Sequence, residues 1–360
     1  MTLALDLALL AVSFIIILAG AELFTNGVEW LGQRLGLSEG MVGSVLAAVG
    51  TAMPETMIPI IAIIFVGTEA SEQVGIGAIL GAPFLLSTAA MFVTGVAVLF
   101  FHRRGGRKAH LVIDQAVVGR DLRFFLGMYV VAIGMGLPLF DKPFPLRLAV
   151  GIGLILAYVW YVRRTASGPK TESTEALGLL HMTKWGLQPR AVRLLEEHGL
   201  AAPDTRSVVV QVFVALVAIV AGAQLFVDKV QSLATTLGVA PLVLSLIVAP
   251  LATELPEKFN SVIWIRQRKD TLAMGNISGA MVFQSCIPVA VGLWFTPWIL
   301  NEFAIASAVI AIGAGVLMQV YLRTDRVISG RELTSLGFFY LAFIVWVVAF
   351  PHATPPPTPH

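Results

Sequence analysis

Long apolar runs follow one another along almost the whole chain, separated by short polar segments. A transmembrane α-helix needs about 20 consecutive, mainly apolar residues, and each run is close to that length or longer. The pattern predicts an all-α polytopic membrane protein. We expect ten transmembrane helices, at residues 4–31, 41–67, 72–101, 122–140, 145–163, 208–236, 240–265, 271–295, 300–322 and 332–350.

Lys and Arg gather in alternate connections between these runs, so that they fall on one side of the membrane if every run crosses once. The basic segments lie around residues 102–123, 163–207, 266–270 and 323–331, whereas the opposite connections hold only Lys142, Arg147 and Lys229. Because cytoplasmic loops carry the excess of Lys and Arg, both termini are expected outside the cytoplasm. The chain shows no transit or retention signal, which favours a multi-pass protein of the plasma membrane, the cell's inner membrane.

The chain repeats itself. Residues 17–55 match residues 219–257 without a gap, with Ala19-Gly20-Ala21 opposite Ala221-Gly222-Ala223. The match resumes in the next helix, where Gly77 and Gly81 align with Gly275 and Gly279. Each half then holds five helices, and an odd number makes the second copy enter the membrane from the opposite side, as an inverted repeat.

Four segments follow from this organisation. We expect a first five-helix repeat at 1–165, a cytoplasmic linker at 166–206, a second and inverted five-helix repeat at 207–352, and a disordered tail at 353–360.

Composition agrees with a membrane protein and excludes several other classes. Apolar residues make up 57% of the chain, charged residues 13%, and the mean hydropathy is +0.85. The net charge of +2 comes without aromatic residues interleaved among the basic ones, so nucleic-acid binding is not expected. A lone cysteine, Cys286, offers no disulfide framework or metal cluster. No Ser/His pair and no His-Glu-x-x-His phrase lies at membrane depth, which argues against an intramembrane hydrolase and against an enzyme in general.

The candidate chemistry lies in a phrase that occurs once in each half. Gly50-Thr51-Ala52-Met53-Pro54-Glu55 is matched by Ala252-Thr253-Glu254-Leu255-Pro256-Glu257. An ionisable side chain at the centre of a membrane helix costs about 2.5–3.5 kcal/mol on insertion scales, so such a residue is a functional candidate. Hard cations take carboxylate, hydroxyl and carbonyl oxygens as ligands. We therefore expect Glu55, Glu257, Thr51 and Thr253 to hold a cation.

Two further residues extend the candidate site. Glu254 adds a carboxylate where the first copy has Ala52. An alternative role for Glu254 is an ion pair with Lys258, one helical turn further on, which would neutralise the carboxylate. Gln284 is the strongest candidate among the polar residues of the partner helices, ahead of Asn276, Ser278 and Ser87. The prolines Pro54 and Pro256 are expected to break their helices and free backbone carbonyls. The four repeat-matched glycines fit either close helix packing or an ion path.

These phrases, each followed by Gly-x-x-x-Gly-Ala, resemble the paired α-repeats of the calcium/cation antiporter superfamily and in particular the sodium/calcium exchanger pattern Gly-Thr-Ser-hydrophobic-Pro-Glu. The resemblance implies a secondary active antiporter that works by alternating access and needs no cofactor. By that resemblance, calcium is held by Glu55 and Glu257, Thr51 and Thr253 contribute oxygens, and sodium ions take adjoining hydroxyl and carbonyl positions. Inorganic cations and the lipid bilayer are the partners it implies.

The sequence also departs from the family pattern. The third and eighth helices of the family read Gly-Ser-Asn-hydrophobic-Phe followed by Asn or Asp, where this chain reads Gly81-Ala82-Pro83-Phe84-Leu85-Leu86 and Gly279-Ala280-Met281-Val282-Phe283-Gln284. The sodium-ligating serines become Ala82 and Ala280, so fewer sodium positions remain. A proton as the counter-ion, another cation in place of calcium, and a family member that binds cations without transporting them are the alternatives.

Overall fold

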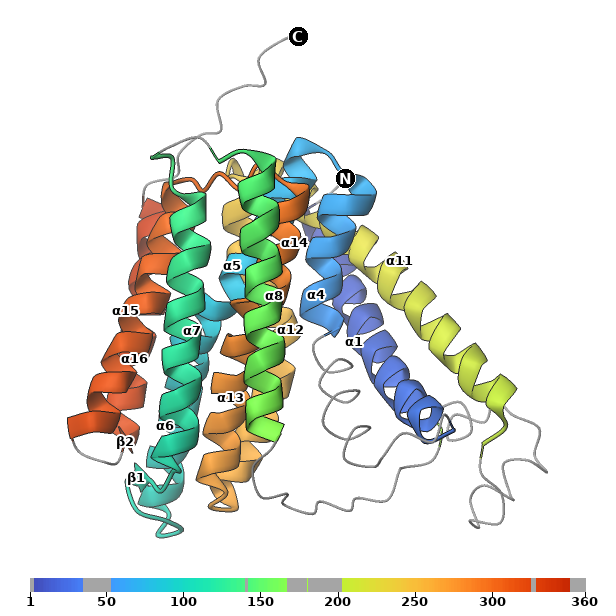
Figure 1. Cartoon of the computed structure of the whole chain (residues 1–360). Coiled ribbons are helices and arrows are strands. Elements are labelled where there is room, and N and C mark those ends of the chain that lie inside the picture. The colour runs from blue at the N-terminus through green and yellow to red at the C-terminus, as the bar shows by residue number, and fades with distance from the viewer. Residues whose placement is uncertain are drawn as a thin grey trace. The chain divides into compact units, whose positions relative to one another are not determined.

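The computed structural model describes residues 3–34, 53–139, 142–166, 180, 203–324 and 328–349, and these are almost entirely helical (Figure 1). The helices are α1 (Leu3–Arg34), α4 (Met53–Ile60), the π-helical η2 (Ile61–Val66), α5 (Glu69–Ser87), α6 (Ala89–Arg103), α7 (Gln115–Gly136), α8 (Phe144–Ala166), α11 (Thr205–Leu237), α12 (Pro241–Arg266), α13 (Asp270–Gln284), α14 (Ile287–Phe295), α15 (Glu302–Thr324) and α16 (Gly330–Ala349). Two short strands, β1 (His110–Leu111) and β2 (Ile328–Ser329), form an antiparallel pair. Most of the predicted linker, the predicted tail and Thr51 lie outside the described residues.

Seven helical segments in the described part of the chain are long and apolar enough to cross a membrane: Leu3–Leu31, Glu69–Arg103, Phe144–Thr165, Thr205–Leu237, Asp270–Phe295, Glu302–Arg323 and Gly330–Ala349. Two shorter apolar helices, Pro54–Val66 and Pro241–Glu254, add to them. The prediction of an all-helical polytopic membrane protein is thus confirmed. The count of ten spans stays a prediction, because the N-terminal part of α7 carries the charged residues Arg120, Asp121 and Arg123 and the apolar stretch of α12 ends at Glu254.

Two spans predicted as single helices are each divided in two. Residues 72–101 form α5 and α6, which meet at Thr88, and residues 271–295 form α13 and α14, which meet at Ser285 and Cys286. The second break has a direct cause, since Pro288 has no N–H to donate to the carbonyl of Gln284.

At each of the two breaks a serine hydroxyl donates a hydrogen bond to a backbone carbonyl. In the alignment that pairs Gly77 with Gly275, Ser87 pairs with Ser285. The Ser87 hydroxyl donates to the carbonyl of Phe84 at 3.2 Å, and the Ser285 hydroxyl donates to the carbonyl of Val282 at 2.8 Å. Side-chain bonds of this kind satisfy carbonyls that an interrupted helix leaves free.

The expectation that Pro256 breaks its helix is wrong, because α12 runs without interruption from Pro241 to Arg266. Membrane helices tolerate proline where neighbouring helices and Ser or Thr side chains compensate for the missing bond. For Pro54 the expectation stays a prediction, because the residues before Met53 lie outside the described part of the chain. Helix α4 continues into the π-helical η2, which ends at Gly67 with a φ of 62°.

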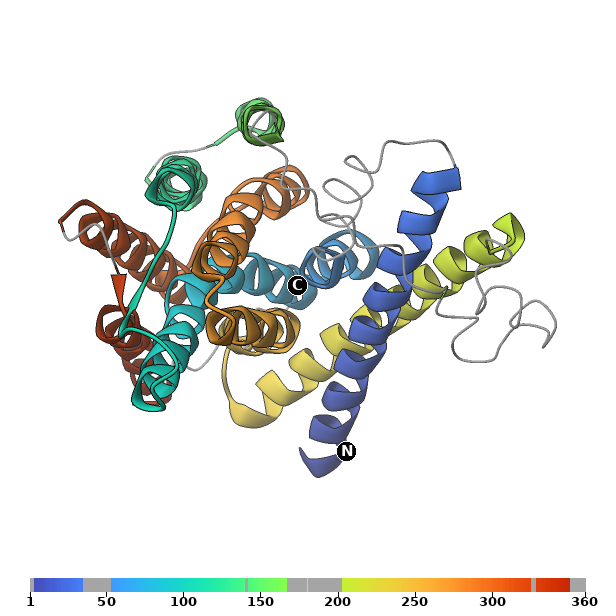
Figure 2. The same ribbon diagram turned by 90° about the horizontal axis from the view of Figure 1, so that it is seen from below.

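The chain divides into two compact units, 1–58 with 168–229 and 59–167 with 230–360, and each takes residues from both predicted repeats. In the first unit α1 lies against α11 (Figure 2). The amide of Gln211 on α11 donates to the carbonyl of Leu23 and to the side chain of Asn26 on α1, both at 2.9 Å. Lys229, counted above with a connection, lies inside α11 and pairs with the buried Asp6 at 3.4 Å.

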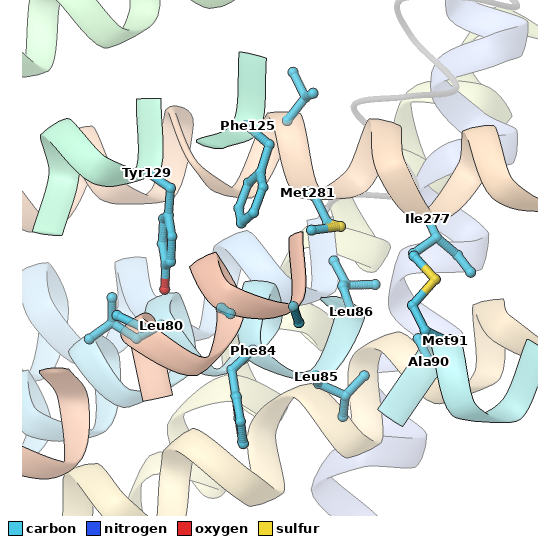
Figure 3. Close-up of a cluster of buried hydrophobic side chains, with 14 of the residues drawn as sticks. Leu80, Phe84, Leu85, Leu86, Ala90, Met91, Phe125, Tyr129, Ile277 and Met281 are labelled. Carbon is cyan, nitrogen blue, oxygen red and sulfur yellow. The ribbon is translucent and has the colours of Figure 1, made fainter. Parts of the chain in front are cut away.

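The second unit is built around α5. Every residue of α5 from Val74 to Ser87 is buried, whereas α8 exposes large apolar side chains such as Leu156 and Trp160, so α5 is central and α8 peripheral. Apolar side chains from α5, α6, α7 and α13 meet in one cluster, which includes Leu80, Phe84, Phe125 and Met281 (Figure 3).

Glycines allow α5 to lie directly on α12. A Cβ at Gly77 or Gly81 would overlap the carbonyl oxygen of Leu242 or Leu246. Pro250 has no N–H to donate to the carbonyl of Leu246, and Gly81 covers that carbonyl. For these two glycines the packing interpretation is confirmed, while a Cβ at Gly275 or Gly279 meets no described atom within 4 Å.

Three of the four basic connections come together at one end of this unit (Figure 1). β1 follows α6, β2 precedes α16, and the two strands pair. Arg107, in the connection after α6, forms a bidentate ion pair with Asp270 at the start of α13, and both N–O distances are 2.8 Å. Arg107 also donates to the carbonyl of Ile265, so it joins the connection to the end of α12.

Candidate functional site

A buried ion pair lies in the middle of α12. The Nζ of Lys258 is 3.4 Å from Oε2 of Glu254, one helical turn away, and the two side chains are 1% and 0% exposed. This geometry agrees with the alternative explanation of Glu254, since Lys258 faces its carboxylate, and the role of Glu254 stays a prediction. The second copy gains a carboxylate and an ammonium together rather than a lone acid.

Gln284 reaches the same carboxylate from the neighbouring helix. Its Nε2 donates to Oε1 of Glu254 at 3.4 Å, and Gln284 is 1% exposed. Gln284 is the last residue of α13, next to the break, and Pro288 cannot donate to its carbonyl. The structure thus brings two predicted site residues together beside a backbone carbonyl released by proline.

Thr253 precedes Glu254 and is 2% exposed. Its hydroxyl donates to the carbonyl of Ala249 at 3.2 Å, which is the usual bond of a threonine inside a helix. The hydroxyl oxygen keeps lone pairs that accept a proton or contact a cation. Pro256 likewise has no N–H for the carbonyl of Ala252, so this part of α12 offers backbone as well as side-chain oxygens.

The repeated phrase contributes one glutamate to α4 and one to α12. Glu55 lies in the first described turn of α4 and is 8% exposed. Glu257 lies on α12 directly after Pro256, and its side chain is outside the described residues, as is the whole of Thr51. Among the side chains that are described, no group of three or more His, Cys, Asp or Glu residues converges on one point.

The positions where the family pattern has polar ligands are apolar and buried on α5. Ala82 is 2% exposed and Leu86 is 0% exposed, so neither position supplies an oxygen. Leu86 instead belongs to the apolar cluster of Figure 3. The polar side chains shown in contact with one another come from α12 and α13.

A further buried carboxylate, Asp121 on α7, was missed by the sequence analysis. It is 3% exposed and accepts bonds from the hydroxyls of Tyr161 at 2.5 Å and Ser278 at 2.7 Å. Ser278, a candidate ligand by sequence, is therefore bound to Asp121. The signal was weak because Asp121 stands between Arg120 and Arg123 at the edge of a predicted span, where charged residues are read as part of a loop.

The described cluster of Glu254, Lys258, Gln284 and Thr253 combines a carboxylate, an ammonium, an amide and a hydroxyl away from water. Oxygen donors of these types suit hard cations such as calcium and sodium. Charges at this depth are weakly screened by solvent, so gaining or losing one cation changes the local free energy strongly. The amide and hydroxyl oxygens of this cluster can contact a cation, while the carboxylate of Glu254 already faces the ammonium of Lys258.

The chain matches the family model described as "Sodium/calcium exchanger protein" over residues 5–165 and 207–350. The Escherichia coli (strain K12) inner membrane protein YrbG is 21% identical over 348 residues, covering 94% of this chain and 97% of that protein. The sodium/calcium exchanger MaX1 of Methanosarcina acetivorans is 22% identical over 355 residues, covering 94% of this chain and 97% of that protein.

Solved structures share the fold. The H+/Ca2+ exchanger CAX has a TM-score of 0.65 at 17% identity, covering 96% of this chain and 82% of that one. The sodium-calcium exchanger NCX_Mj has a TM-score of 0.55 at 16% identity, covering 96% of this chain and 99% of that one. With a family match over most of its length and relatives aligned nearly from end to end, the chain belongs to the sodium/calcium exchanger protein family.

Proposed function

We propose that this protein is a secondary active cation antiporter that exchanges calcium for sodium by alternating access. The observation that carries the proposal is the family's Pro-Glu phrase, present in both halves of the chain and followed each time by a glycine-rich helix. Membership of a family of exchangers supports a transporter rather than an enzyme.

Glu55 and Glu257 supply the carboxylates for calcium in this proposal, and their two formal charges equal that of one calcium ion. Thr51 and Thr253 add hydroxyl or backbone oxygens, and Gln284 adds an amide beside the break in α13. Support comes from the burial of Glu55 and Thr253 and from the placement of Gln284 against α12. Glu254 belongs to the same site as a carboxylate balanced by Lys258.

The two halves act as inverted five-helix repeats in this proposal, with ten spans, both termini outside the cytoplasm and a place in the cell's inner membrane. Reciprocal helix contacts support the repeat. α6 packs on α16, where a Cβ at Gly95 would stand 2.6 Å from the carbonyl oxygen of Gly330, and α14 packs on α8, where Gly151 meets Trp294. α16, the last helix of the second half, thus lies on α6, which follows the break in the first half. In the same way α8, the last helix of the first half, lies on α14, which follows the break in the second half. The clustering of three basic connections at one end supports the sidedness.

A proton as the counter-ion is the second candidate. The specific observation in its favour is the loss of oxygen donors at Ala82 and Leu86, both buried in apolar surroundings. Fewer oxygens disfavour sodium, whereas a carboxylate needs no further ligand to take up a proton.

Calcium uptake into proteoliposomes tests these proposals. Purified protein is reconstituted, and radiolabelled calcium uptake is driven by an outward sodium gradient, an outward proton gradient, or neither. Uptake with the sodium gradient, lost in Glu257→Gln, supports calcium/sodium exchange, and uptake with the proton gradient alone supports the second candidate. Calcium binding without uptake under either gradient would overturn the antiporter proposal in favour of a family member that binds cations without transporting them.

A further inference from the structure

Lys258 is a buried cation inside a site proposed to bind cations. It lies near the middle of α12, and its side chain is 1% exposed. Lysine is among the residues least often buried completely, and an ammonium at membrane depth is costly. Its position therefore calls for a specific reason.

Stability is a weak reason for this ion pair. Replacing a buried ion pair by apolar side chains of similar volume is often neutral or stabilising, because removing both charges from water costs more than their attraction returns. The ion pair itself is formed within one turn of a single helix. The Arg107–Asp270 pair, in contrast, ties the connection after α6 to the start of α13.

The two oxygens of Glu254 face different groups. Oε1 accepts from the amide of Gln284 on α13, and Oε2 faces the ammonium of Lys258, each at 3.4 Å. A monovalent cation bound to Glu254 would take the place that Nζ occupies. Lysine suits this place, since its ammonium is a compact charge on a flexible stem.

We propose that the ammonium of Lys258 is a built-in monovalent cation for Glu254, so that this carboxylate neither binds calcium nor recruits a sodium ion from solution. The inference rests on the proposed function, and it makes Lys258 the residue that sets how many counter-ions the site takes up. An exchanger with one cation permanently attached needs one fewer from solution in each cycle.

The repeat supports treating the pair as one device. Glu254 aligns with Ala52, and continuing the alignment by one residue places Lys258 opposite Thr56. Both charges are thus present in the second copy and absent from the first, and together they leave the net charge unchanged. The proposed calcium ligands Glu55 and Glu257 then match the charge of calcium without a contribution from Glu254.

Equilibrium binding to the purified full-length protein in detergent tests the inference separately from transport. The thermal unfolding midpoint is followed while sodium chloride replaces choline chloride at constant ionic strength, because a ligand of the folded state raises the midpoint according to the number of ions bound. Lys258→Met is expected to bind about one sodium ion more than the wild type. Two variants are expected to show the sodium dependence of the wild type. Glu254→Gln/Lys258→Met has no carboxylate left to balance, and Lys258→Arg keeps a positive charge beside Glu254.

Calcium binding to the same variants gives the second test. The double variant Glu254→Gln/Lys258→Met is expected to keep the calcium dissociation constant within about threefold of the wild type, because it loses no calcium ligand. A loss of about tenfold or more in the double variant would make Glu254 a calcium ligand and overturn the inference. An unchanged sodium dependence in Lys258→Met would also overturn it. If Lys258→Met does not fold, the double variant still decides, because it leaves no unpaired charge from this pair.

The two proposals can fail independently. If the wild-type protein transports no calcium in proteoliposomes, the exchange is refuted. The role of Lys258 is then still decided by whether Lys258→Met binds an additional sodium ion in detergent. A wild-type protein that exchanges calcium, with a Lys258→Met variant whose sodium dependence is unchanged, keeps the exchange and refutes the role of Lys258.

Discussion

Gly20 on α1 lies directly against Ile219 on α11: a Cβ built on the glycine would stand 2.8 Å from Cγ1 of the isoleucine. The same contact occurs with the roles exchanged, because a Cβ on Gly222 would stand 2.8 Å from Cγ1 of Ile17. In the repeat alignment Gly20 pairs with Gly222 and Ile17 with Ile219. A contact in which equivalent residues exchange roles is the pattern made by two copies related by a two-fold axis.

Enlarging Gly20 should therefore separate the two helices. We expect Gly20→Val to lower the free energy of unfolding by about 1–3 kcal/mol, the usual cost of overpacking a filled interface. Thermal unfolding in detergent measures the change. Gly153→Ala on α8 is the control, because a Cβ there meets no described atom within 4 Å, and an equal loss in both variants would contradict the packing argument.

A repeat-matched pair of glycines gives a second prediction. Gly81→Ala should destabilise the protein, because its Cβ would overlap the carbonyl of Leu246 on α12, a backbone atom that moves only with its helix. Gly279→Ala should cost little or be slightly stabilising, because a Cβ there meets no described atom and alanine favours helix by about 1 kcal/mol over glycine. Unfolding midpoints of the two variants, measured side by side, check the difference. Equal midpoints would mean that the contact between α5 and α12 is looser than described.

The helices and their membrane character were largely predictable from the apolar runs, since periodicity and length depend on local sequence. The interruptions were not. Hydroxyls that donate to the carbonyl of Phe84 accompany the break at Thr88, whereas Pro256, a strong local signal, lies within a continuous α12. Membrane helices tolerate proline where their surroundings compensate for the lost bond. Local signals thus located the elements but not their breaks.

The candidate site was predictable in its residues and less so in its contacts. Glu254 and Gln284 were both candidates, but only the structure shows the amide of one on the carboxylate of the other. The opposing roles open to Glu254, ligand or neutralised acid, could not be separated without knowing that Lys258 is buried and faces it. Asp121 was missed because its partners, Tyr161 and Ser278, come from two other helices.

The Arg107–Asp270 pair should contribute to stability as a connection between distant segments. Both side chains are 4% exposed, and Asp270 also accepts the N–H of Val112 at 2.8 Å. Removing one member leaves a buried charge, so Arg107→Met should cost about 3–5 kcal/mol. Arg107→Met/Asp270→Leu should recover part of that loss. Unfolding of the single and double variants measures it, and purely additive losses would show that the pair does not act as a unit.

Glu55→Gln and Glu257→Gln provide the prediction that bears on the proposed calcium site. The amide keeps the size of the side chain but removes its charge, and divalent ions depend on ligand charge for affinity. We expect each variant to lose calcium uptake in proteoliposomes while it keeps a normal unfolding profile. Folding should be retained because removing a charge from an apolar helix relieves desolvation.

The control for these variants lies on the same helix. Ser261→Ala on α12 removes a buried hydroxyl two turns from Glu254 and leaves every proposed ligand in place, so it should transport calcium like the wild type. Wild-type uptake in both glutamate variants would remove the two carboxylates from the site. Loss of uptake in only one of them would show that the two halves, though matched in sequence, contribute unequally to the calcium site. A single carboxylate would then bind the ion, and the other oxygens would come from Thr253, Gln284 and the backbone.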